Sequence, residues 1–311
     1  MPLITPTSLV LGVLLSAYLK DFSPLIPWIF AFMTFSGSLS SNFRSLMEAF
    51  THPLPMVIAL MILHVFMPFW AWGVGHVIFS DDSFTITGLV LSMAIPTGIS
   101  SFIWVSIYMG NIVFTLSIIL LDTLLSPIIV PFTLSLLIGS KVELDVWGMM
   151  QGLFGMVVLP SILGMLLNQL TKGKVTVELG TRLAPFSKIG IGLVVMINGA
   201  VVAPYIRNVD LKLVTIAITV LCIAFTGYLF SFLFGRFILK DKENVIALTY
   251  TGGMRNISAG AVLAVSYFPA PVAIPVILGM LFQQVLASLF GLAVDRYYSK
   301  KKDYVLQQQT G

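Results

Sequence analysis

Thr249–Ser258 reads T-Y-T-G-G-M-R-N-I-S and lies inside an otherwise apolar stretch from Asn244 to Val294. Arg255 would stand at a depth where hydrocarbon surrounds an isolated helix, and an ionised side chain there costs about 2.5–3.5 kcal/mol on insertion scales. Gly252 and Gly253 weaken the helix beside it, and backbone freed at that depth is tolerated only when it is buried in protein or faces water. A broken helix that carries a charge near the middle of the membrane is typical of the binding site of a secondary transporter.

The composition indicates a polytopic membrane protein. Of the 311 residues, 58% are hydrophobic and 10% are charged, whereas a soluble protein carries about 25% charged residues. The single cysteine, Cys222, excludes an internal disulfide and a cysteine-only metal cluster, and we expect neither a metal nor a cofactor. The basic residues lie in short loops between apolar stretches, so the pI of about 9.1 does not indicate nucleic-acid binding. No H-E-x-x-H or G-x-S-x-G motif occurs, and we do not expect an enzyme.

About 20 apolar residues cross a bilayer as a helix, and clusters of charged or turn residues divide the chain into about ten such spans. The expected spans are 8–19, 24–40, 54–79, 84–108, 112–138, 146–170, 184–206, 211–238, 244–267 and 271–294. Lys and Arg in short loops favour the cytoplasmic side. With the N-terminus inside, twelve of them fall on that side and four on the other. We therefore expect a multi-pass protein of the cell (inner) membrane with both termini in the cytoplasm.

The fourth and the ninth expected span carry matching interruptions. Ala94–Ser101 reads A-I-P-T-G-I-S-S, and Gly252–Ala259 reads G-G-M-R-N-I-S-A. An even division gives two halves of five helices, which must be inverted relative to each other because five is odd. Interruptions at corresponding places in inverted repeats point to a binding site. Alternatively, Pro96 only kinks one helix and the glycines only allow close packing of the other.

Three groups of segments, taken together, resemble the bile acid:sodium symporter family. Similar to its G-x-x-L-x-x-x-D-F-x, H/R-P and M-P stretches are Phe35–Arg44, His52-Pro53 and Phe66–Pro68. Similar to its P-G-G-x-x-S-N, G-N and T-L-x-S-P crossover stretches are Pro96–Ser101, Gly110-Asn111 and Thr123–Pro127. Similar to its second crossover, E-x-G-M-Q-N-S-G, is Gly253–Asn256. The match covers nearly the whole chain in order.

The resemblance implies an all-α fold of ten helices in two inverted five-helix repeats, with broken helices 4 and 9 crossing at their unwound centres. It also implies two domains that move against each other in alternating access. The panel domain would comprise residues 1–52 and 141–208, and the core domain residues 53–140 and 209–298. Residues 299–311 would form a cytoplasmic tail, in which Lys300–Lys302 would attract anionic lipids.

The resemblance further implies sodium sites, and here the sequence departs from the family. There, oxygens of both crossovers hold sodium, including a glutamate, glutamines and an asparagine. The glutamate position falls at Thr251 and the crossover glutamine at Arg255, while Ser101, Thr115 and Asn256 remain polar. A hard cation needs several oxygen ligands, and a guanidinium would repel it. We therefore expect these positions to be vestigial. Ordinary sodium-coupled symport and a channel-like pore remain alternatives.

The expected substrate is a small organic anion, either a carboxylate or a bile-acid-like amphipathic acid. Arg255 would be its charge partner. The residues expected to add hydrogen-bonding groups are Thr97, Ser100, Ser101, Asn256, Ser258, Gln283 and Gln284. The residues expected to shape the crossover backbone are Pro96, Gly98, Gly252 and Gly253. For the two adjacent glycines, we expect a positive φ or a backbone pressed against the fourth span.

Asp122 is the second charged residue within an apolar span, about 15 Å into the fifth one. A buried ion must be paired or must face water, so we expect Asp122 and Arg255 to form an ion pair. That pair would be either a structural lock or a gating and coupling element, and protons are then candidate coupling ions. His64 is either a proton carrier or a hydrogen-bonded core histidine.

Overall fold

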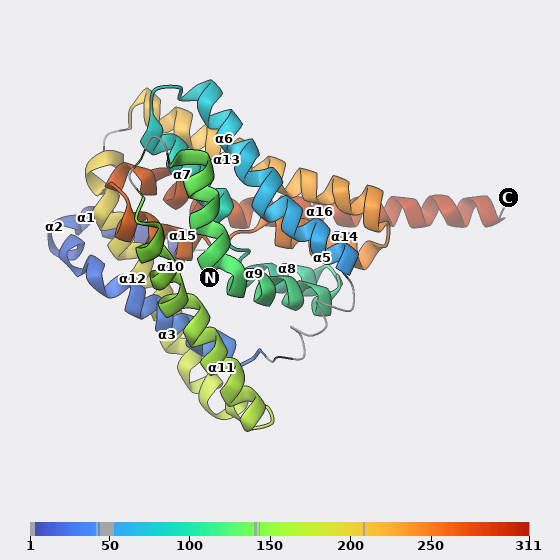
Figure 1. Ribbon diagram of the computed structural model, residues 1–311. Helices are drawn as coiled ribbons and strands as arrows, with labels where there is room; N and C mark the ends of the chain where they lie inside the picture. The colour runs from blue at the N-terminus through green and yellow to red at the C-terminus, as the bar shows by residue number, and fades with distance from the viewer. Residues whose placement is uncertain are drawn as a thin grey trace.

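The computed structural model describes residues 4–41, 43, 53–139, 142, 144–207 and 209–310, so Arg44 and His52 lie outside the described residues. In this part of the chain every regular element is helical (Figure 1). Six helices are long and apolar enough to cross a membrane. They are Pro53–Ile78 (α5, η2 and α6), Ile112–Ile138 (α9), Val146–Leu170 (α10, η3 and α11), Thr176–Ile206 (η4 and α12), Leu211–Leu239 (α13 and η5) and Ala270–Tyr298 (η6 and α16, the latter spanning Ala273–Thr310). These six occupy the expected spans 54–79, 112–138, 146–170, 184–206, 211–238 and 271–294.

The first two expected spans do not form two straight helices. They comprise α1 (Ile4–Leu14), α2 (Ser16–Leu19), η1 (Lys20–Leu25) and α3 (Ile26–Ser38), with a bend of 87° between the helices Thr5–Leu14 and Ser16–Ser38. Counted together as one broken span, they would bring the spans of the described chain to seven. Pro24 and Pro27 lie close after the bend, and their missing N–H groups weaken the helical ladder there.

The fourth and the ninth expected span are each interrupted, as the sequence predicts. The fourth consists of α7 (Ser83–Ala94) and α8 (Ser100–Ile107). The ninth consists of α14 (Lys242–Gly253) and α15 (Ile257–Tyr267). Ile95 is extended, with ψ 151°, because the ring of a following proline excludes helical backbone. In the ninth span the break begins directly after the two adjacent glycines.

The helix starts follow from short polar side chains in the loops. Asp82, Asn111, Asp145, Asp210 and Asp241 each accept a hydrogen bond from a backbone N–H in the first turn of the helix that follows. Such caps satisfy donors that a helix cannot pair internally. They place the start of α7, α9, α10, α13 and α14 where the sequence has its loops.

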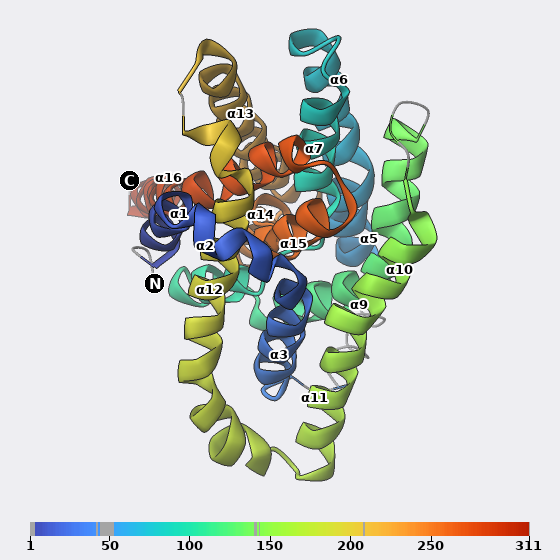
Figure 2. The same cartoon turned by 90° about the vertical axis from the view of Figure 1, so that its left-hand side faces the viewer.

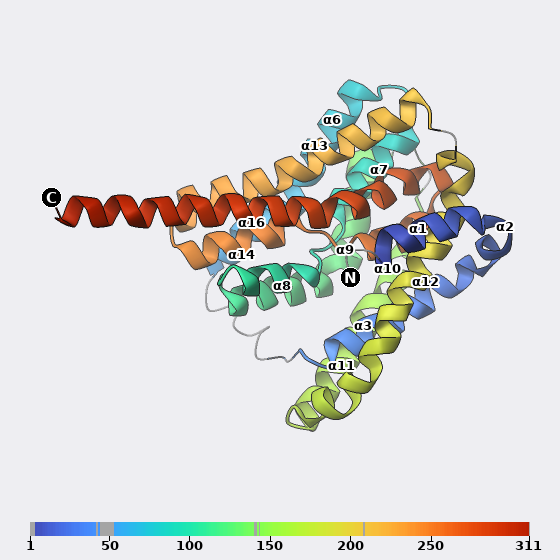
Figure 3. The same cartoon turned by 180° about the vertical axis from the view of Figure 1, so that it is seen from behind.

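The helices pack in two groups. Helix α3 packs against both α11 and α12, in the lower part of the views in Figures 2 and 3, and α1 lies along α12. In the other group, α13 packs against α14 and α16, and α7 packs against α6, α9 and α16. The C-terminal part of α16 projects beyond the remaining helices (Figure 1). The two broken helices belong to the second group, and α15 also contacts α12 and α3.

Candidate functional site

The breaks of the fourth and the ninth span cross and pair with each other. Thr97 and Arg255 form an antiparallel β-bridge. The N–H of Asn256 donates to the carbonyl of Pro96 at 2.8 Å, and the N–H of Gly98 donates to the carbonyl of Met254 at 3.4 Å. Backbone groups freed from two helices at this depth thus satisfy each other, as an apolar surrounding requires.

Thr97 holds this crossing together with its side chain. Its hydroxyl Oγ1 lies 2.7 Å from the carbonyl oxygen of Thr251 and 3.0 Å from that of Met254. Thr97 is fully buried. A hydroxyl directed at the last carbonyls of α14 ties the two breaks, so the structure places Thr97 within the scaffold of the crossing.

Asp122 of α9 contacts both the crossing and His64. Its Oδ2 accepts the backbone N–H of Thr97 at 2.6 Å, and its Oδ1 lies 2.6 Å from Nε2 of His64. Asp122 is 0% exposed and His64 is 8% exposed. The expected direct ion pair between Asp122 and Arg255 is wrong, because the carboxylate is occupied by a histidine and a backbone amide. Among the described residues, Asp122 pairs with His64, and the guanidinium nitrogens of Arg255 have no hydrogen-bond partner.

His64 reaches Asp122 from a wide turn. It lies in the π-helical segment η2 (Ile62–Phe66), which ends two residues before Pro68. A proline clashes with the carbonyl four residues earlier and cannot donate to it, which favours a wider turn at that place. Segment η3 (Phe154–Val158) stands in the same relation to Pro160. The buried partner of Asp122 is therefore positioned by a local irregularity in the helix.

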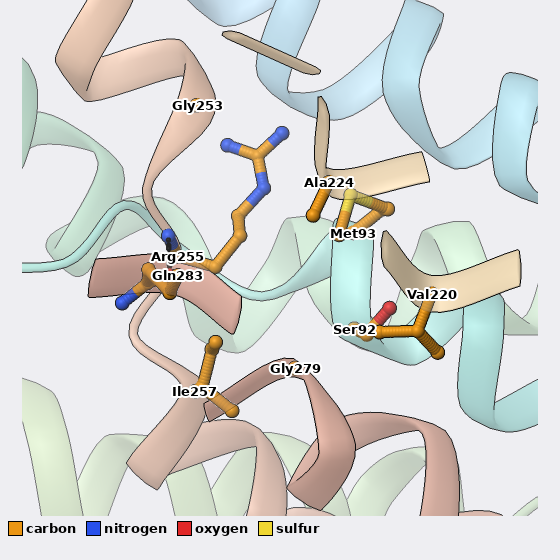
Figure 4. A pocket seen from close by; sticks show the side chains of 9 residues that line it. All are labelled: Ser92, Met93, Val220, Ala224, Gly253, Arg255, Ile257, Gly279 and Gln283. Carbon is orange, nitrogen blue, oxygen red and sulfur yellow. Dashed lines mark hydrogen bonds between the residues drawn. The ribbon is translucent and has the colours of Figure 1, made fainter. Parts of the chain in front are cut away.

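Arg255 is the most unusual residue of the crossing. Its side chain is 2% exposed, and its backbone N–H donates to Oε1 of Gln283 at 2.8 Å. Among the described residues, no atom accepts a hydrogen bond from its guanidinium nitrogens Nε, Nη1 and Nη2. Figure 4 shows the guanidinium extending away from Gln283 and Ile257, on the side where Gly253 and Ala224 lie.

A cavity of about 20 Å³ adjoins this guanidinium (Figure 4). Its lining residues come from α7, α13, α14, α15, α16 and the second break. They are Ser92, Met93, Val220, Ala224, Gly253, Arg255, Ile257, Gly279 and Gln283. This volume holds about one water molecule. An organic anion therefore fits beside Arg255 only if these helices separate.

The other expected substrate residues lie around the crossing but not along this cavity. Ser100 and Ser101 open α8, and Ser258 lies in the first turn of α15. The hydroxyl of Ser101 is buried without a hydrogen-bond partner in the described residues. Gln284 is exposed, and its Oε1 accepts the indole N–H of Trp104 at 3.0 Å. The cavity thus brings together Arg255 and Gln283 of the expected set, and it adds Ser92, which no sequence signal indicated.

The positions that correspond to the family's sodium ligands are mostly engaged within their own helices. The hydroxyl of Thr251 donates to the carbonyl of Ala247 at 2.8 Å, and that of Thr115 donates to the carbonyl of Asn111 at 2.8 Å. The side chain of Asn256 caps α15 by accepting the N–H of Ala259 at 3.3 Å. The described part of the chain contains no group of three His, Cys, Asp or Glu side chains that could hold a metal ion.

The two adjacent glycines serve a different contact from the expected one. Neither has a positive φ, and both end α14. A Cβ on Gly253 would overlap the ring of Tyr228, and a Cβ on Gly252 would overlap the hydroxyl of Ser231, both on α13. The expected positive φ is therefore wrong, while α14, which the two glycines end, does pack against α8 of the fourth span. Within the fourth span, a Cβ on Gly98 would lie 2.8 Å from the carbonyl oxygen of Arg255.

Comparisons with known proteins find relatives that match most of this chain. The model of the sodium bile acid symporter family matches residues 27–209. The uncharacterized protein YbaS of Bacillus subtilis is 56% identical over 300 residues, which cover 96% of this chain and 98% of YbaS. The uncharacterized sodium-dependent transporter YocS of the same organism is 24% identical over 94% of this chain and 89% of its own length. The probable sodium/metabolite cotransporter BASS5 of Arabidopsis thaliana chloroplasts is 24% identical over 94% of this chain and 74% of its own length.

A family of transporters confirms the expectation that the chain is not an enzyme, and its apolar helices make it a multi-pass membrane protein. The family model covers more than half of the chain, including the first break, and the second break pairs with the first. The chain belongs to the sodium bile acid symporter family of secondary transporters.

Proposed function

We propose that this protein moves a small organic anion across the cell membrane by alternating access, with Arg255 as the charge partner of the anion. The observation that carries the proposal is a buried guanidinium whose nitrogens have no acceptor among the described residues. A buried charge without a partner is strongly unfavourable. A carboxylate is its natural complement, because it can accept two parallel hydrogen bonds from a guanidinium.

The packing of the helices supports alternating access. In this proposal the panel domain comprises residues 1–52 and 141–208 and the core domain residues 53–140 and 209–298, which the packing of α3 against α11 and α12 and of α13 against α14 and α16 supports. Since the cavity beside Arg255 has room for about one water molecule, the anion enters only when helices around it move apart. In this proposal the two broken helices are corresponding members of two inverted five-helix repeats, both termini lie in the cytoplasm, and the end of α16 approaches anionic lipids.

The first prediction concerns Arg255. In a thermal-shift screen of the purified protein against a carboxylate library that includes cholate and short monocarboxylates, we expect at least one compound to raise the unfolding temperature. Arg255→Gln should weaken its binding about 10- to 100-fold, because a charge-assisted hydrogen bond contributes about 1.5–3 kcal/mol. The matched control is Arg182→Gln, an exposed arginine of α12. Unchanged affinity in Arg255→Gln, or equal binding of the uncharged amide of the same compound, would contradict the proposal.

The second prediction concerns sodium. YocS and BASS5 carry sodium in their names, so sodium coupling is the alternative to be tested. At the positions of the family's glutamate and crossover glutamine, this chain has Thr251 and Arg255, so a carboxylate and an amide oxygen are missing and a buried cationic side chain stands at the crossing. Uptake of the bound carboxylate into proteoliposomes should therefore be equal with an imposed sodium gradient and with choline. A large rise with sodium would restore ordinary sodium symport.

A further inference from the structure

The buried pair of His64 and Asp122 has a vacant position for one proton. An ionised Asp122 only accepts hydrogen bonds, so Nε2 of His64 then carries the hydrogen that lies between it and Oδ1. The other ring nitrogen, Nδ1, is then the basic atom. It is buried and has no hydrogen-bond partner within the described ranges. A proton added there converts the pair into an imidazolium and a carboxylate.

The surroundings of the pair are nearly free of competing charges. Segment η2 packs against α5, α6, α7 and α9. Of these, α5 and α7 carry no titratable side chain, α6 carries His76, and α9 carries only Asp122. Among the elements that pack against α9, helices α8 and α10 carry no titratable side chain. Helix α14 carries Lys242 and Glu243 in its first turn and the buried Tyr250. The phenol of Tyr250 donates to the carbonyl of Ala287.

The remaining charge in this interior is Arg255, which sits in the bridge with Thr97. Thr97 is the same residue whose N–H bonds to Asp122 at 2.6 Å. With His64 neutral, one carboxylate and one guanidinium give the interior no net charge. An anion bound at Arg255 would leave it with one negative charge, and uptake of one proton by His64 would return it to zero. Since unbalanced charge is costly in a medium of low dielectric constant, the two binding events should favour each other.

We propose that the His64–Asp122 pair is a proton-binding site and that its proton is the coupling ion for the anion bound at Arg255. The coupling part rests on the proposed function, whereas the proton site stands on the geometry of the pair. The proton enters at Nδ1 of His64 when the helices around the pair open to water. The pair is linked to the anion site through Thr97, so both ligands act on the same crossing.

The test uses the full-length protein in detergent with ¹⁵N-labelled histidine, and the ring-nitrogen resonances of His64 are assigned from their absence in His64→Gln. In a pH titration of the wild type, the ring-nitrogen resonances of His64 should shift as the ring binds one proton. Arg255→Gln removes one positive charge, as anion binding would, and should move the midpoint of this titration upward by about one pH unit. Arg255→Lys keeps the charge and should leave the midpoint near that of the wild type.

Each result bears on a different part of the inference. Constant His64 resonances throughout the pH titration of the wild type would overturn the proton site. A titration that Arg255→Gln and Arg255→Lys leave equally unchanged would overturn the coupling. His76→Gln is the control for general effects of removing a histidine, and it should leave the His64 titration as in the wild type. Carboxylate binding that needs Arg255 but does not depend on pH would leave the proposed function standing and overturn only this inference.

Discussion

Asp122→Ala is expected to destabilise the protein by about 3–5 kcal/mol, because it removes one member of a buried charged contact and leaves the groups that contacted it without a partner. Asp122 is 0% exposed, and both of its oxygens have partners, His64 and the backbone N–H of Thr97. Alanine at position 122 would leave the buried backbone N–H of Thr97 without an acceptor. The measurement is the unfolding free energy in detergent. The control is Asp295→Ala, an exposed aspartate of α16.

A double-mutant cycle identifies the partner of Asp122. His64 and Asp122 are in contact, with 2.6 Å between Nε2 and Oδ1. Two residues in contact show an interaction free energy of about 0.5–3 kcal/mol. We therefore expect the losses of His64→Ala and Asp122→Ala to be far from additive. The losses of Asp122→Asn and Arg255→Gln should be closer to additive, since the two side chains form no direct ion pair. If the second cycle gave the larger interaction free energy, Arg255 rather than His64 would be the partner.

The breaks in the helices could be predicted because their causes are local. Pro96 forces extended backbone on the residue before it, and Gly252 and Gly253 weaken the end of a helix. The long spans could be predicted from apolar length. The sharp bend of 87° between Thr5–Leu14 and Ser16–Ser38 was missed, since the sequence shows two apolar stretches but not their angle.

The partner of Asp122 could not be predicted, because it depends on the rotation of helices from distant parts of the sequence. Asp122 and Arg255 are expected at a similar depth in the membrane, and pairing them by depth alone led to the wrong ion pair. The π-turn before Pro68 turns His64 toward α9. A wide turn changes which side of a helix the following residues occupy. A prediction that assumes a regular period of about 3.6 residues therefore places these residues on the wrong side. The contact of Gly253 with α13 was missed because it also depends on how distant helices are rotated relative to each other.

Gly253→Val is expected to abolish transport while the protein still inserts into the membrane. Gly253 ends α14 two residues before Arg255 and also lines the cavity. A Cβ at this position would overlap the ring of Tyr228, which is fully buried and whose hydroxyl donates to the carbonyl of Gln283 at 3.1 Å. Overpacking in a buried site costs about 1–3 kcal/mol and shifts backbone. The break that carries Arg255 should therefore move out of register with the first break.

The measurement is uptake of the bound carboxylate by Gly253→Val in proteoliposomes, with insertion checked by size-exclusion chromatography of the extracted protein. The matched control is Gly73→Val in α6, where a Cβ meets no atom within 4 Å and uptake should persist. A second variant separates overlap from stiffening of the helix end. Tyr228→Ala removes the ring that the valine would strike, so Gly253→Val with Tyr228→Ala should regain part of the stability lost in Gly253→Val. Full uptake by an inserted Gly253→Val would show that the end of α14 need not fit closely against α13, and no recovery in the double variant would mean that the valine acts through the backbone of the break itself.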